Sequence, residues 1–132
     1  MKPTEEMKKL SIAFVVALLC GAGAMAATSG ARANTPTTVT IEYNGDGFQG
    51  KVKSPRPHCV KSRTVKVYKQ KGSFPDPRGR DKKLFKDKSN RKGRWDTGNT
   101  GQAQGKFYAL AERTVSNEQI ACKKGVSKTI KV

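Results

Sequence analysis

The apolar stretch near the N-terminus decides how much of this chain can belong to a folded domain. Lys8 and Lys9 precede a largely apolar segment, residues 10–19, and the small-residue run after it ends in Ala24-Met25-Ala26. A basic start, a short apolar centre and an Ala-x-Ala end are typical of a secretory signal peptide. We therefore predict a helical signal peptide over residues 1–26, with cleavage after Ala26 or, at a second Ala-x-Ala match, as late as residue 33.

Two other fates of this segment fit the residues less well. A retained anchor would need about 20 apolar residues, but the second half of the uncharged stretch before Arg32 is mostly Gly, Ala, Ser and Thr, with no basic stop-transfer cluster after it. Lipid attachment at Cys20 is the other alternative, but Leu19 stands where such signals have Gly, Ala or Ser. We therefore expect a secreted protein, extracellular or in the cell envelope, with no membrane span once the leader is removed.

The residues that follow the leader make up one small, strongly basic domain. From Asn34 onwards the chain has 99 residues, with 23 Lys and Arg against eight Asp and Glu, a net charge of +15. Cys59 and Cys122 remain as an even pair, which in an oxidising compartment predicts a disulfide. A metal site or a reactive thiol is the alternative. Both fit poorly, because there is no CxxC pair and His58 is the single histidine, whereas structural zinc takes four ligands.

Alternating and turn-rich segments predict an all-β domain over residues 38–132. Val39, Ile41 and Tyr43 alternate with polar residues, and the sequence Asn44-Gly45-Asp46-Gly47 follows as a hairpin turn. The small polar residues 27–37 before this strand predict a flexible arm. Frequent turns and a long-range cysteine pair together predict a single Greek-key β-sandwich of about seven short strands. The expected strands are residues 38–43, 48–52, 64–69, 83–88, 94–97, 106–112 and 126–132.

Three local motifs resemble those of a known group of exported bacterial modules. They are Phe48-x-Gly50-x-Val52, then Asp87 followed by Gly93-Arg94-Trp95, and finally Gly105-Lys106-Phe107-Tyr108-Ala109 before the last strand. In this order they resemble transthyretin-like, carboxypeptidase-regulatory-like and Cna-B-like β-sandwich modules. The resemblance implies an adhesive, structural or accessory role. The chain departs from Cna-B-like modules in having no Asn or Asp after Asn117, so we do not expect their Lys-to-Asn crosslink.

Residues capable of acid–base or nucleophilic catalysis are few and scattered. His58 lies between Pro57 and a cysteine expected to be oxidised, which favours a surface or packing role. The eight acids show no paired-carboxylate pattern. The spacing Asp87-x-Ser89-x-Arg91 superficially resembles a calcium loop, but the adjacent cations would repel the ion. We therefore expect no enzyme activity, no cofactor and no metal.

The densest chemical signal is a basic run over residues 78–95. It contains nine bases, two acids and two aromatic residues, Phe85 and Trp95. Such density can form a polyanion-binding surface. The alternative is a solvated hairpin whose lysines protect an exposed sheet edge. The candidate polyanion-binding residues are Arg78, Arg80, Lys82, Lys83, Lys86, Lys88, Arg91, Lys92 and Arg94.

These observations predict a secreted, non-enzymatic β-sandwich module that associates electrostatically with anionic envelope or extracellular polymers, without a specific nucleic-acid partner. One alternative is a secreted enzyme inhibitor or accessory enzyme domain that acts through the Pro-rich loop 72–81. Another is a basic antimicrobial-like protein. The sequence specifies neither the polymer nor the oligomeric state.

Overall fold

The regular secondary structure in the described part of the chain is almost entirely short β-strands. The computed structural model describes residues 33–117 and 120–132, so the predicted signal peptide and residues 27–32 of the predicted arm lie outside it. The elements are β1 (Ala33–Thr35), β2 (Thr38–Val39), β3 (Glu42–Tyr43), β4 (Phe48–Lys53), the 3₁₀ turn η1 (Pro57–Cys59), β5 (Thr64–Lys69), β6 (Lys82–Lys88), β7 (Arg94–Asp96), β8 (Lys106–Ala111), β9 (Thr114–Asn117), β10 (Ile120–Cys122), β11 (Gly125–Val126) and β12 (Ile130–Lys131).

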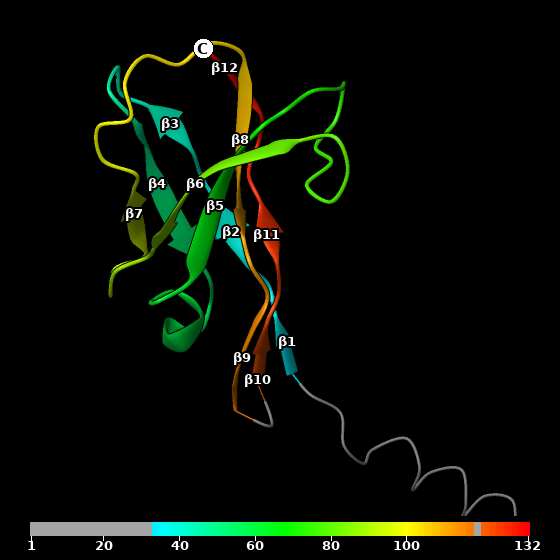
Figure 1. Ribbon diagram of the computed structural model, residues 1–132. Coiled ribbons are helices and arrows are strands. Elements are labelled where there is room, and N and C mark those ends of the chain that lie inside the picture. The colour runs from blue at the N-terminus through cyan, green and yellow to red at the C-terminus, as the bar shows by residue number, and fades with distance from the viewer. Residues whose placement is uncertain (1–32, 118–119) are drawn as a thin grey trace, which may run out of the picture. The chain divides into compact units, whose positions relative to one another are not determined.

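Two antiparallel sheets enclose the main core (Figure 1). In the larger sheet β5 lies between β6 and β8, and β8 also pairs with β11 and β12. In the smaller sheet β4 pairs with β2 and β3 along one edge and with β7 along the other. If β2–β3 and β11–β12 each count as one interrupted strand, these sheets contain the seven predicted strands. The predicted all-β sandwich is confirmed.

Alternation along the central strands sends every second side chain into the core. Val65 and Val67 of β5 are 0% exposed, and their neighbour Lys66 faces outward. Phe48 and Val52 do the same on β4, with Gly50 between them. Gly50 is required there because a Cβ would overlap the carbonyl oxygen of Thr40. Lys51 N donates to Thr40 Oγ1, a side-chain oxygen, so the regular backbone ladder is interrupted there and the predicted strand 38–43 is divided into β2 and β3.

Two bulges interrupt the regular alternation in the larger sheet. One residue is added to β6 opposite Val67, and as a result the neighbours Leu84 and Phe85 both pack against the core. The predicted strand 126–132 is likewise split. Val126 pairs with the outward-facing Leu110, whereas Ile130 pairs with the core residue Phe107, so the pairing register shifts by one residue between them.

A third, three-stranded sheet was not predicted from the sequence. β9 and β10 form a hairpin, and β1 pairs with β10 in parallel. The prediction of a flexible arm over residues 27–37 is therefore wrong for residues 33–35, since Thr35 is buried in this sheet. β10 also contains Cys122, which forms the predicted disulfide with Cys59 of η1, at a Cα–Cα distance of 5.4 Å. Both cysteines are fully buried.

Candidate functional site

The nine candidate bases are all exposed, but the fold does not gather them into one patch. Three of them, Lys83, Lys86 and Lys88, lie on β6 and share one face of it. The register shows this, because Lys86 stands opposite Lys66 and Lys83 opposite Tyr68, and both partners face away from the main core. We call Lys83, Lys86 and Lys88 the β6 row.

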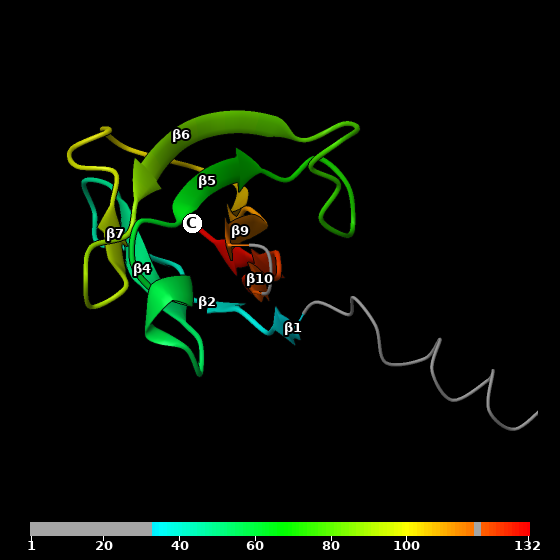
Figure 2. The ribbon, with the colours of Figure 1, turned by 90° about the horizontal axis from the view of Figure 1, so that it is seen from below.

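The β6 row follows the free edge of the larger sheet. β6 is the last strand in that sheet, and Figure 2 shows it as the outermost strand beyond β5. At about 3.3 Å per residue the row extends over roughly 16 Å. The separation of neighbouring lysines in the row is therefore similar to the Debye length, which is about 8 Å at physiological salt. At such a separation their charges act on a polyanion together.

The other six bases occupy different places. Arg78 and Arg80 belong to the loop before β6, and Arg91 and Lys92 to the turn after it. Lys82 stands opposite Lys69, beyond the bulge, and faces a cleft at the end of the core. Arg94 lies on β7 opposite Lys51, in the smaller sheet. A run that is continuous in sequence is thus divided among two sheets, a loop and a turn.

Few carboxylates neutralise these bases. Among the described residues the ion pairs are Lys66 with Glu112, and Arg80 with Asp76 at 3.9 Å. Only Arg80 belongs to the nine candidates. The β6 row is therefore exposed and unpaired within the part of the chain that the structure describes, which leaves its full charge available to an external anion.

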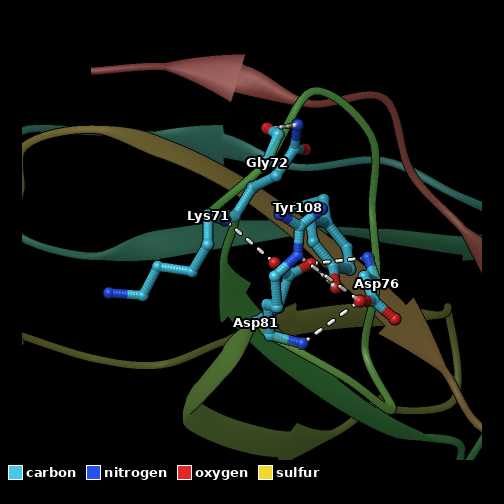
Figure 3. A network of polar contacts seen from close by, with 7 residues as sticks. Lys71, Gly72, Asp76, Asp81 and Tyr108 are labelled. Atoms are coloured by element: carbon cyan, nitrogen blue, oxygen red, sulfur yellow. Dashed lines mark hydrogen bonds and ion pairs between the residues drawn. The ribbon is translucent and has the colours of Figure 1, made fainter.

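A buried carboxylate at the N-terminal end of β6 closes the loop 72–81. Asp81 accepts hydrogen bonds from Tyr108 Oη at 2.6 Å, from Asp76 N at 2.6 Å and from Lys71 N at 2.9 Å (Figure 3). Asp76 in turn accepts from the backbone N–H of Arg80. Because Tyr108 faces outward from β8, these contacts fix the base of the loop on the outer face of the larger sheet.

The same contacts set the ionisation of the Asp81–Tyr108 pair. Burial by itself raises the pKa of Asp81, but hydrogen bonds from Tyr108, Lys71 and Asp76 and the nearby Arg80 charge outweigh it, so this pKa lies below its ordinary value. Burial and the hydrogen bond to Asp81 raise the pKa of Tyr108 well above its ordinary value. Near neutral pH the pair is therefore a carboxylate that accepts from a neutral phenol.

The loop 72–81 presents one apolar side chain to solvent. Phe74 is 59% exposed, more than Val126 or Val115, the other exposed large hydrophobic side chains among the described residues. The loop that carries it is held at Gly72, whose carbonyl accepts from Lys106 Nζ at 2.7 Å and from Gln70 Nε2 at 2.9 Å. Phe74 therefore projects from a loop whose two ends are fixed by hydrogen bonds.

Arg63 is a buried cation that the sequence did not reveal. It is 1% exposed, and its guanidinium donates to the carbonyl oxygens of Cys59, Glu112 and Lys123 at 2.7–2.8 Å, and to Thr37 Oγ1 at 3.0 Å. Burial lowers its pKa, yet an arginine stays charged in proteins. It connects the disulfide region to three distant segments, so its role is structural.

The described residues contain no arrangement suited to metal binding. They include no group of three or more His, Cys, Asp or Glu side chains that could hold an ion. His58 lies in η1, half-buried, and its Nε2 has no hydrogen-bond partner within the described ranges. That position agrees with a packing role.

No helix in residues 33–117 and 120–132 is long and apolar enough to cross a membrane. Comparison of the chain with family models, curated proteins and solved structures gave no match. The resemblance to transthyretin-like and related modules therefore stays a prediction.

Proposed function

We propose that this protein is a secreted, non-enzymatic β-sandwich module that binds anionic polymers of the cell envelope or extracellular space. The observation that carries the proposal is the β6 row, three exposed and unpaired lysines in line along a sheet edge. A linear polyanion can follow such a row and contact successive charges. Arg91 and Lys92 lie in the turn that follows β6, and the net charge of +15 from Asn34 onwards adds a general attraction.

Salt-dependent binding to heparin tests the proposal and locates the surface. The variant K83Q/K86Q/K88Q is compared with K51Q/K53Q/K131Q, which removes the same charge from three other exposed strand residues. The β6 variant should lower the slope of log affinity against log salt by about three, one for each lysine that no longer binds an anionic group. The control should lower it by less than one. Equal reductions in both variants would show that net charge alone drives binding and would overturn the β6 site.

Export is tested separately. The full chain produced in a bacterial host should yield a secreted form whose first residue is Ala27 or Asn34, as read by N-terminal sequencing. A chain that stays in the cytoplasm with residues 1–26 attached would contradict the secreted part of the proposal.

The exposed Phe74 favours a second candidate, a protein-binding or inhibitory loop at residues 72–81. An aromatic side chain on a loop fixed at both ends loses little conformational entropy when it enters a pocket. In a pull-down of proteins from culture surface extracts, F74A should then lose the captured proteins while K83Q/K86Q/K88Q keeps them. The opposite pattern would favour the β6 row.

A further inference from the structure

A cleft distinct from the β6 row lies at the end of the core where β8 begins. It has a volume of about 300 Å³ and opens between the ends of β5 and β6 and the loop 97–105. Lys69, Lys71 and Lys82 stand at its rim, and Leu84 and Phe85 form one wall. None of the described residues that line this cleft is acidic.

The floor of the cleft is aromatic. Phe48 lies at the centre, with its ring centroid 4.9 Å from that of Phe107 and 6.3 Å from that of Phe85. Phe48 and Phe107 are almost completely buried, whereas Phe85 and Leu84 are partly exposed, and all four line the cleft. The cleft therefore offers an apolar surface that solvent reaches from the open side.

The opposite wall is fixed by hydrogen bonds. Ala103 N donates to Tyr43 Oη at 3.1 Å, and Thr100 N donates to the Asp46 carbonyl oxygen at 2.7 Å. Gly105 and Val132 exchange two backbone hydrogen bonds of 2.8 and 3.0 Å. Because these contacts hold loop 97–105 in place, the cleft is already formed before a ligand binds.

The arrangement of the lysines at the rim lowers the stability of the fold. Lys69 and Lys82 stand directly opposite each other on β5 and β6, and like charges in that position are destabilising. Lys66 and Lys86 are another such pair in the same ladder, but Lys66 has an ion pair with Glu112. Neither Lys69 nor Lys82 has an ion-pair partner among the described residues. An anion bound between them would relieve their repulsion.

Lys71 adds a third charge to the same rim. Its backbone N–H is bonded to Asp81, but its side chain extends away from that carboxylate (Figure 3). The Asp81 network therefore positions this residue without neutralising its ammonium group.

We propose that the cleft binds a small amphiphilic anion, with its carboxylate between Lys69, Lys71 and Lys82 and its apolar part against Leu84 and Phe85. A volume of 300 Å³ corresponds to about ten water molecules of liquid. A ligand of roughly ten non-hydrogen atoms, such as a medium-chain or aromatic carboxylate, would fill it. The cleft lies on the side of β6 that faces the core, and the β6 row lies on the opposite side of the same strand. The two sites are therefore distinct.

Calorimetric titration with octanoate tests both halves of the recognition. Octanoate should bind at one site, while sulfate, which lacks the apolar part, and octanol, which lacks the charge, should each bind at least tenfold more weakly. Amide NMR shifts on titration should concentrate at Lys69, Lys82 and Ala103. Equal binding of octanoate and sulfate, or shifts confined to the β6 row, would overturn the proposal.

Variants separate the cleft from the polymer surface. K69Q/K82Q should weaken octanoate binding at least tenfold, whereas K86Q/K88Q, which alters the outer face of the same strand, should leave it within twofold. Ala103→Phe fills the cleft from the loop side and should abolish binding without altering the charge. If K69Q/K82Q and wild type bind octanoate with equal affinity, the octanoate site is not the cleft. Heparin affinity is read in parallel, so that failure of the octanoate site and failure of polymer binding are told apart.

Discussion

Removing the Tyr108 hydroxyl tests whether the Asp81 network stabilises the domain. In Tyr108→Phe the carboxylate of Asp81 loses the 2.6 Å hydrogen bond from Tyr108 and keeps its two backbone donors. A hydrogen bond to a charged group in a buried site contributes about 2 kcal/mol. For a domain of this size that corresponds to a fall in Tm of about 8–10 °C at pH 7.

Tyr68→Phe is the matched control for this change. Tyr68 stacks on Tyr108, with ring centroids 5.4 Å apart, but its hydroxyl has no hydrogen-bond partner within the described residues. Removing that hydroxyl should change the free energy of unfolding by less than about 0.5 kcal/mol. Urea unfolding followed by circular dichroism measures both variants.

The pH dependence gives the test its sharpest form. The raised pKa of Tyr108 stabilises the fold below the ordinary tyrosine value of about 10 and loses that effect above it, by about 1.4 kcal/mol per pH unit. A 2 kcal/mol advantage of wild type over Tyr108→Phe should therefore vanish near pH 11.5. It should also shrink in acid, as the lowered pKa of Asp81 is crossed and its carboxylate is protonated. A difference that stays constant from pH 3 to pH 11.5 would refute the reasoning.

Three further changes test the framework. Arg63→Met leaves the carbonyl oxygens of Cys59, Glu112 and Lys123 without this donor and should cost at least about 3 kcal/mol in urea unfolding; full stability would contradict the structural role of Arg63. Replacing Cys59 and Cys122 by Ser opens a loop with a sequence separation of 63 and should cost about 4 kcal/mol, read from the urea midpoint against oxidised wild type; an unchanged midpoint would mean that the bridge does not restrain the unfolded chain. Gly50→Ala places a Cβ on the Thr40 carbonyl and should lower stability by about 1–3 kcal/mol in a thermal melt; an unchanged Tm would show that the strand can move aside.

Strand positions were predictable from sequence where alternation is local. Val65 and Val67 alternate with polar neighbours, and both are fully buried as expected. The pattern fails at the bulges, because the adjacent pair Leu84 and Phe85 gives no sign that both face inward. β1, β9 and β10 were missed because strands of three or four residues are too short for alternation to stand out. In addition, β1 pairs with β10, which lies far away in the chain.

The sequence identified the basic residues of the candidate site but did not show which of them lie on the same surface. A period of two places Lys86 and Lys88 on one face of β6, and the residue added at the bulge brings Lys83 onto the same face. Lys82 faces the other side, and Arg94 lies in the other sheet. Arg63 could not be found, because the oxygens that bury it belong to backbone groups up to 60 residues away. Asp81 left a weak signal, as an acid that ends a Pro-rich loop five residues after Asp76.

The disulfide also determines how the domain would respond to a pulling force. Cys59 and Cys122 enclose β5 to β9, which include the β6 row and most of the core of the larger sheet. Tension between the chain ends passes through the bridge and cannot extend the enclosed segment, which withholds roughly 220 Å of contour length at about 3.5 Å per residue. Only the segments before Cys59 and after Cys122 can unravel. A module attached to a polymer through β6 would therefore keep its point of attachment inside the covalently closed part of the chain.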